Sequence, residues 1–169
     1  MGSLTEDQVK EAYRRYFPII VRKSGRMLRD ASEAQDLAQE TFLRLWRSRL
    51  DLRDTAATTA WLYKTCTRLA LDRLRSPVKP AAGTAELADA IASPEANAEE
   101  RSHHRAMLQE MLGRFPHDEL EAAVLSRVDG LNHQEIGEVL GISERTVRRL
   151  LSRIDERLVG WRARREVVA

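Results

Sequence analysis

A stretch of helix-breaking and small residues in the middle of the chain separates two segments with helical patterns. Its breakers are Pro77, Pro80, Gly83 and Pro94. Proline interrupts a helix, and one lysine against five acidic residues at positions 76–100 suits a solvated linker. Elsewhere, no run of alternating β-branched residues predicts a strand. Ser93 before a proline is a typical helix start. The sequence therefore predicts an all-α chain of two small helical domains, residues 1–75 and 94–169, joined by a flexible acidic linker at 76–93.

The composition excludes several classes of protein. Cys66 is the single cysteine, so neither an intramolecular disulfide nor a Cys-rich zinc site can form, and a reducing compartment is expected. No run of about 18 apolar residues and no signal peptide is present, which predicts a cytoplasmic protein without membrane insertion. Sequence motifs of phosphate-binding loops, zinc proteases and serine hydrolases are absent, and His103 and His104 lack metal-binding spacing. We expect no catalytic residues, no metal site and no cofactor.

Two amphipathic helices are predicted in the first 50 residues. Residues 5–29 carry an apolar stripe at helical spacing, and Pro18 within it predicts a kink or a break. Asp30 or Ser32 would cap the second helix. The expected core residues are Val9, Tyr13, Tyr16, Phe17, Ile20 and Val21, followed by Leu37, Ala38, Thr41, Phe42, Leu45 and Trp46. The opposite face of the second helix is charged, as solvated faces are, although Leu43 within it also fits a partner surface.

A basic helix with two aromatic residues ends this half of the chain. Residues 51–60 lack an apolar pattern and predict a polar loop, and residues 61–75 then predict a helix. This helix has four basic residues against one acidic residue, together with Trp61 and Tyr63. Cations bind phosphates and flat rings stack on bases, so the helix fits single-stranded nucleic acid. The alternative is that both aromatic residues belong to the core.

The C-terminal half contains the pattern of a helix-turn-helix. Asn132 and Glu135 have capping-box spacing, and Gly141 fits a left-handed turn before Ser143 caps the next helix. The inner positions are Ile136, Val139, Leu140, Val147, Leu150 and Leu151. In such motifs the second helix enters the major groove of DNA, where arginine binds guanine or phosphate. Eight arginines against four acidic residues from position 141 onward favour this interpretation, and a helical hairpin that binds only protein is the alternative.

The order of these parts resembles bacterial sigma factors of the extracytoplasmic-function type, in the sigma-70 family. Residues 30–47, DASEAQDLAQETFLRLWR, resemble the second conserved region of these factors. Residues 60–75, AWLYKTCTRLALDRLR, resemble the promoter-melting helix that closes that region. Residues 114–158, which include the helix-turn-helix, resemble the fourth region. The ordered pair of motifs, at this spacing and total length, is more specific than either motif alone.

The resemblance implies a sigma factor that directs core RNA polymerase to specific promoters and assists promoter melting, without catalysing a reaction. It implies as partners the β′ clamp helices and β flap of the polymerase, promoter DNA as −35 duplex and −10 single strand, and an anti-sigma factor. The implied polymerase-binding residues are Asp36, Gln39, Glu40, Leu43 and Arg44. The implied −10 residues are Trp61, Tyr63, Lys64, Arg68, Arg73 and Arg75. The implied −35 residues are Ser143, Arg145, Thr146, Arg148, Arg149 and Arg153.

Several positions depart from the pattern of this family. Arg68 stands where an Asn is common, which affects −10 recognition. Arg145 replaces a small residue, and Arg149 and Leu150 replace Ser and Arg, so we expect an unusual −35 preference. Leu120 replaces an Arg and predicts a difference in packing. Two other functions stay open: a stand-alone helix-turn-helix regulator that binds duplex DNA by itself, and a helical module that binds only protein.

Overall fold

Helices make up all the regular secondary structure of the described residues, as the sequence predicts. The computed structural model describes residues 5–48, 50–75, 106 and 109–166. The helices are α1 (Glu6–Leu28), α2 (Ala31–Arg47), α3 (Thr55–Arg75), α5 (His117–Arg127), α6 (His133–Leu140) and α7 (Glu144–Glu166). A shorter helical segment covers residues 109–114. The predicted linker at 76–93, the helix start at Ser93 and the adjacent His103 and His104 lie outside the described residues.

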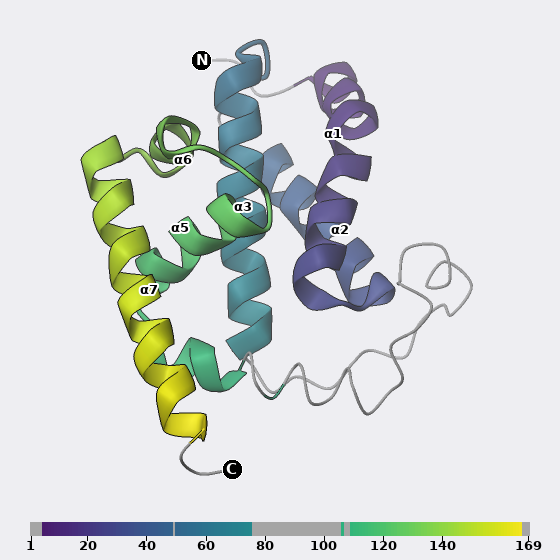
Figure 1. Cartoon of the computed structure of the whole chain (residues 1–169). Coiled ribbons are helices and arrows are strands. Elements are labelled where there is room, and N and C mark those ends of the chain that lie inside the picture. Colours follow the sequence, from purple (N-terminus) through teal and green to yellow (C-terminus); the bar gives the residue numbers. More distant parts are fainter. Residues whose placement is uncertain (1–4, 49, 76–105, 107–108, 167–169) are drawn as a thin grey trace.

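The first three helices pack together and form what we call the N-terminal bundle (Figure 1). α1 begins with a capping box in which the Thr5 hydroxyl accepts a hydrogen bond from the Gln8 N–H at 3.4 Å, and the Gln8 side chain accepts one from the Thr5 N–H at 3.1 Å. Of the two candidates for the cap of α2, Asp30 fills the position and accepts from the Glu33 N–H at 2.8 Å. The caps thus define where both helices begin.

α1 continues through Pro18, so the proline does not divide this helix. A proline at this position cannot donate to the carbonyl group of Arg14. Both residues are exposed, so water can reach the carbonyl oxygen that lacks a helical donor. Tyr16 and Ile20, on either side of the proline, are both buried, so the core-facing side of α1 is kept.

α3 begins at Thr55 rather than at residue 61, and the prediction of a polar loop over 51–60 is therefore wrong for its second half. Asp54 provides the start of this helix. Its carboxylate accepts a hydrogen bond from the Ala57 N–H at 2.9 Å, and its carbonyl oxygen accepts one from the Thr58 N–H at 2.9 Å. Thr58 is buried, so this first turn packs against the bundle although its sequence has no apolar pattern.

The core of the N-terminal bundle is built from all three helices. Its fully buried side chains include Ile20, Leu37, Leu45 and Leu62. Two residues predicted to lie in the core do not: Tyr13 is 41% exposed and Trp46 is 53% exposed. Both lie at the edge of an amphipathic stripe, where helical spacing alone does not distinguish buried from half-exposed positions.

Residues 109–166 form the C-terminal bundle. α7 is a single helix of 23 residues that continues well beyond Leu151, the last inner position predicted for the helix-turn-helix. Near its end, Trp161 is buried in a cluster with Leu112 and Phe115. The Trp161 indole N–H donates to the Glu110 carboxylate at 3.2 Å. Leu120 is also buried, so this departure from the family pattern adds apolar volume to the core.

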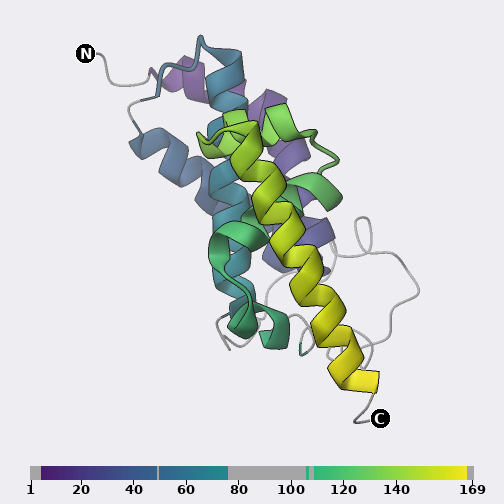
Figure 2. The same cartoon turned by 60° about the vertical axis from the view of Figure 1, so that its left-hand side comes forward.

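The two bundles pack against one another along α3 (Figures 1 and 2). α3 contacts α5 and α6, and buried residues from both bundles belong to one apolar cluster. Lys23 of α1 forms a buried ion pair with Asp129, which follows α5. The described residues therefore form one packed unit, which is the compact one of the two arrangements that a long linker allows.

Candidate functional site

α6, the turn after it and the start of α7 form the predicted helix-turn-helix (Figure 1). Asn132 and Glu135 make the predicted capping box, with hydrogen bonds of 3.0 Å and 2.7 Å. Gly141 has a φ of 72°, a left-handed conformation that glycine adopts without strain. A Cβ atom on Gly137 would lie 2.7 Å from the carbonyl oxygen of Ile142. The turn can therefore pack this closely on α6 only because residue 137 has no side chain.

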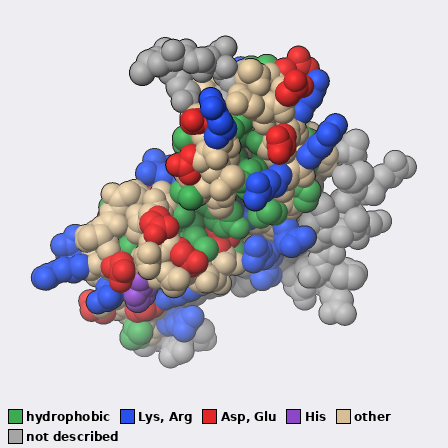
Figure 3. All heavy atoms as spheres, turned by 90° about the horizontal axis from the view of Figure 1, so that it is seen from above, with side chains coloured by type: hydrophobic (Ala, Val, Ile, Leu, Met, Phe, Trp, Pro, Cys, Tyr) green, Lys and Arg blue, Asp and Glu red, His purple; other side chains and the backbone are tan. Residues whose placement is uncertain are grey.

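The first turns of α7 present a basic face to solvent. The Ser143 hydroxyl caps the helix by accepting from the Thr146 N–H at 3.2 Å. The exposed cations that follow are Arg145, Arg148, Arg149 and Arg153. Arg148 pairs with Glu144 at 3.1 Å, an exposed pair that contributes little to stability. Lys and Arg side chains project where this end of α7 lies, at the left edge of Figure 3. The six residues of the predicted −35 surface thus lie together at one end of α7.

The five residues of the predicted polymerase surface lie along α2. Asp36, Gln39, Leu43 and Arg44 are exposed, and Glu40 is half-buried. The Glu40 carboxylate pairs with Arg44 at 2.7 Å and with Arg73 of α3 at 3.5 Å. Leu43 is 59% exposed, so an apolar side chain stands beside the acidic ones. This face can offer both charge and apolar contact to a partner.

An apolar groove of about 420 Å³ adjoins this face, between α1 and α2. It is lined by Val9, Lys10, Tyr13, Arg14, Gln39, Phe42, Leu43 and Trp46. Gln39 and Leu43 belong to the predicted polymerase surface, whereas Tyr13 and Trp46 were predicted to lie in the core. Large apolar side chains that remain half-exposed around a groove are typical of binding surfaces. The sequence did not predict that Tyr13 and Trp46 line a groove beside Gln39 and Leu43.

The six residues of the predicted −10 surface lie on different sides of α3. Trp61 is half-buried against the core, and Arg75 is exposed. Arg73 points to α2, where it donates to the Glu33 carbonyl oxygen at 3.0 Å. The remaining three, Tyr63, Lys64 and Arg68, contact the C-terminal bundle. The packed arrangement therefore does not bring the six together on one open surface.

Lys64 and Arg68 make polar, partly buried contacts with the C-terminal bundle, whereas Tyr63 packs against its apolar cluster. The Lys64 ammonium group donates to the carbonyl oxygen of Leu140 at 3.3 Å. The Arg68 guanidinium group pairs with Glu121, and this hydrogen bond raises the pKa of Arg68. Burial raises the pKa of Tyr63, whose hydroxyl therefore stays protonated to higher pH. Each of these side chains already has a partner within the chain.

Other chemical features of the described residues are few. No helix in them is long and apolar enough to cross a membrane. Nowhere in the described ranges do three or more His, Cys, Asp or Glu residues gather where they could hold a metal ion. The Cys66 thiol is buried, lies 3.4 Å from the Ser24 hydroxyl, and has a pKa raised by burial. A buried thiol with a raised pKa is a poor nucleophile.

A helix-turn-helix with an exposed arginine face, packed on a three-helix bundle, is typical of DNA-binding transcription proteins. Residues 12–77 match the family described as Sigma-70 region 2, and residues 105–158 match Sigma-70, region 4. The ECF RNA polymerase sigma factor SigW of Bacillus subtilis is 31% identical over 147 residues, which cover 79% of this chain and 77% of SigW. The chain therefore belongs to the sigma-70 family, in its extracytoplasmic-function (ECF) group.

Two further comparisons differ in sequence identity and in how much of each chain they cover. "Probable RNA polymerase sigma factor RfaY" of Xanthomonas campestris pv. campestris is 36% identical over 132 residues, or 74% of this chain. The chain spans only 33% of the length of RfaY. A solved structure of CnrH in complex with the cytosolic domain of CnrY matches 93% of this chain and 88% of the CnrH chain, with a TM-score of 0.55 and 18% identity. This last similarity supports the fold alone.

Proposed function

We propose that this protein directs core RNA polymerase to specific promoters and assists promoter melting. The observation that carries the proposal is the separation of two solvent-facing surfaces. The arginine face of α7 belongs to one bundle, and the mixed acidic and apolar face of α2 belongs to the other. One surface can therefore bind DNA while the other binds a protein, as a factor that recruits polymerase to a promoter requires.

The proposed −35 surface is the first part of α7. Arg145, Arg148, Arg149 and Arg153 would reach base edges and phosphates in the major groove, and Ser143 and Thr146 would contact the phosphate backbone. A bidentate arginine–guanine contact is worth about 1–3 kcal/mol of discrimination between bases. The additional arginine at 145 and the exchange at 149 support an unusual sequence preference.

The proposed polymerase surface is the α2 face together with the apolar groove. Basic clamp helices of the β′ subunit would meet Asp36 and Glu40, which gives charge complementarity. The groove would take an apolar side chain of the partner between Tyr13 and Trp46. The C-terminal bundle would bind the β flap, by the family resemblance.

The proposed −10 surface lies on α3. Trp61 and Tyr63 would stack on unpaired bases, and Lys64, Arg68, Arg73 and Arg75 would bind the backbone of the separated strand. Unstacking a base costs a few kcal/mol, so contacts that exist only with the single strand favour the melted promoter. The protein would act by binding, with the chemistry of transcription left to the polymerase.

An anti-sigma factor is the proposed regulatory partner. Such a protein would cover the α2 face, where Leu43 and Trp46 offer exposed apolar area. A polymerase partner would place the chain in the cytoplasm.

Run-off transcription tests this function. Purified protein is added to core polymerase without a sigma factor, together with fragmented DNA of its own genome, and the transcripts are sequenced. Start sites that share −35 and −10 elements are expected. Duplex DNA binding without any transcripts would instead indicate a stand-alone helix-turn-helix regulator, and the absence of both would indicate a module that binds only protein.

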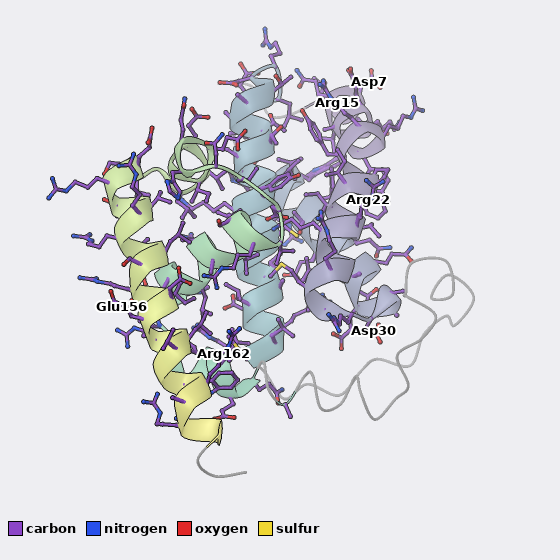
Figure 4. The ribbon with its side chains drawn as sticks, in the orientation of Figure 1. Asp7, Arg15, Arg22, Asp30, Glu156 and Arg162 are labelled. Atoms are coloured by element: carbon purple, nitrogen blue, oxygen red, sulfur yellow. The ribbon has the colours of Figure 1, made fainter. Side chains whose placement is uncertain are left out.

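A matched pair of variants tests the role of α7 on a promoter found in this way. Arg148→Ala is expected to reduce transcription, and Arg162→Ala is the control, because Arg162 is an exposed arginine near the other end of the same helix (Figure 4). Equal activity of the two variants would contradict the −35 assignment.

A further inference from the structure

A pocket of about 350 Å³ lies in the C-terminal bundle, between the end of the segment at 109–115 and the second half of α7. Its lining consists of three arginines, one glutamate, two aromatic residues and one glycine. Its volume is within the range of small-molecule sites, which is about 300–1,000 Å³. None of these lining residues belongs to the proposed polymerase, −10 or −35 surface, so the proposed function does not account for this pocket.

The three arginines reach the pocket from two parts of the chain. Arg157 and Arg164 are separated by about two turns of α7, so both lie on the same face of that helix. Arg114 comes from the segment before α5. Glu156 is the one acidic residue of the lining, so positive charge exceeds negative charge there. An arginine in the last turn of a helix is common, because it faces the negative end of the helix dipole, but Arg157 lies well before the last turn.

Two glutamates outside the pocket hold its arginines in place. The Nε atom of Arg157 pairs with Glu119 at 2.9 Å, and the side chain of Glu119 is 2% exposed. Arg114 pairs with Glu110 at 3.4 Å, and the same carboxylate oxygen accepts the Trp161 indole N–H at 3.2 Å. A guanidinium group has five N–H donors, so these contacts leave donors of both arginines for a ligand.

Gly160 leaves the space between the arginines of α7 open. Glycine is less favourable than alanine inside a helix, so a glycine at this position needs another reason. The packing provides none, because an added Cβ atom would meet only Nη1 of Arg164, at 3.6 Å, the end of a flexible side chain. A residue without a side chain does, however, allow a ligand to approach the helix backbone closely.

We propose that this pocket binds a nucleotide. Phosphate oxygens would accept hydrogen bonds from Arg114, Arg157 and Arg164, because guanidinium groups bind phosphate through paired N–H donors. The flat base would lie against the apolar part of the lining, which Phe115 and Trp161 form. Cations and aromatic rings in one cavity fit a ligand that has both an anionic part and a flat apolar part.

A nucleotide in this pocket would join segments that are far apart in sequence. Arg114 precedes α5, whereas Arg157 and Arg164 follow the helix-turn-helix. A ligand that binds only the folded state stabilises it by mass action, so the end of α7 would be held more firmly. Arg164 lies 15 residues beyond Arg149, or about 22 Å along the helix. The nucleotide and a −35 duplex would therefore occupy different ends of α7.

Isothermal titration calorimetry on the full chain tests the proposal. ADP, GDP, CDP and UDP are the probes, and pyrophosphate provides the same kind of anion without a sugar and a base. The best of the four diphosphates is expected to bind with a dissociation constant of about 10–100 µM, at least about fivefold more tightly than pyrophosphate. Equal affinity for pyrophosphate would refute a nucleotide site, and so would the absence of binding by all four at about 1 mM.

Variants of α7 test whether the arginine pocket is the site. Arg164→Gln removes a guanidinium group that makes no ion pair with a described residue, so the fold should survive while affinity for the best diphosphate falls about tenfold. Arg162→Gln is the matched control, because Arg162 is exposed and lies on another side of α7 from Glu156 (Figure 4). Glu156→Gln removes the negative charge of the lining and should raise the affinity about twofold. Equal affinities of Arg164→Gln and Arg162→Gln would overturn the assignment of the site.

Gly160→Ala separates ligand binding from stability. Alanine favours the helix, so this variant should unfold at a higher temperature than the parent. Its methyl group takes space in the pocket and should weaken binding of the diphosphate at least about fivefold. A purely structural role of the pocket would not produce these opposite changes. Affinity equal to that of the parent would show that the ligand binds elsewhere.

Competition with DNA distinguishes this pocket from the −35 surface. A short DNA duplex in excess should leave binding of the diphosphate unchanged, because the arginine face lies at the other end of α7. Displacement of the diphosphate would assign the three arginines to DNA phosphates and overturn the proposal. The proposal is independent of the proposed function, since binding of the diphosphate is measured without polymerase or promoter.

Discussion

Replacing Gly137 by alanine tests whether the turn after α6 needs a residue without a side chain. The new methyl group would lie 2.7 Å from the carbonyl oxygen of Ile142, which is backbone and cannot rotate away. Alanine improves helix propensity over glycine by about 0.8–1.0 kcal/mol, whereas overpacking costs about 1–3 kcal/mol. The turn must therefore shift, and the angle between α6 and the start of α7 shifts with it.

Gly113→Ala is the matched control, because it lies in the helical segment at 109–114 with no atom within 4 Å of an added Cβ. Both variants gain the same helix propensity, so the difference between them isolates the steric cost. Unfolding in urea followed by circular dichroism should show Gly137→Ala less stable than Gly113→Ala by about 1–3 kcal/mol. Gly137→Ala should also bind −35 duplex more weakly. Equal stability of the two variants would refute the reasoning about the turn.

Three other predictions concern different parts of the molecule. Trp46→Ala should weaken binding to core polymerase in a pull-down at least fivefold. Val159→Ala, which changes an exposed apolar side chain on α7, should leave that binding unchanged. If both variants retain the same amount of polymerase, the groove is not part of the interface. Arg149→Ala should lower affinity for −35 duplex by about 1–3 kcal/mol on the preferred sequence and relax base preference at one position, as measured by fluorescence anisotropy on a set of mutated duplexes. The folded state raises the pKa of the Cys66 thiol above its ordinary 9.0. The contribution of this thiol to the free energy of unfolding is therefore complete below pH 9 and is lost as the pH rises through the pKa of the folded state. Cys66→Ser should therefore lose less stability than the parent in urea titrations as the pH rises above 9, at up to about 1.4 kcal/mol per pH unit, and parallel curves would contradict burial of the thiol.

The helix-turn-helix could be predicted in detail because its signals are local. Asn132 and Glu135 are three residues apart, and the Gly141 turn follows within one short helix. Each signal is a hydrogen bond or backbone conformation set by near neighbours in sequence. The same reasoning failed at the start of α3, where Asp54 caps a first turn of small polar residues that has no apolar stripe.

The boundary between the bundles could not be predicted, because its contacts join residues far apart in sequence. Lys23 lies in an amphipathic helix, where a lysine is expected to reach water, and only the fold brings Asp129 against it. The aromatic groove has a similar cause. Tyr13 and Trp46 fit the apolar spacing of their helices, and whether an edge position is covered depends on the angle at which α1 and α2 pack.

The length of α7 has a consequence for how sequences of this kind can diverge. One end of the helix carries the arginine face, and the other end is held by Trp161 in a cluster with Leu112 and Phe115. Each residue of an α-helix advances the chain by 1.5 Å and turns it by about 100°. Inserting or deleting one residue between Arg153 and Trp161 would therefore swing the arginines to another side of the bundle. Single substitutions along α7 can accumulate in evolution, but the number of residues between the arginine face and Trp161 has to stay the same.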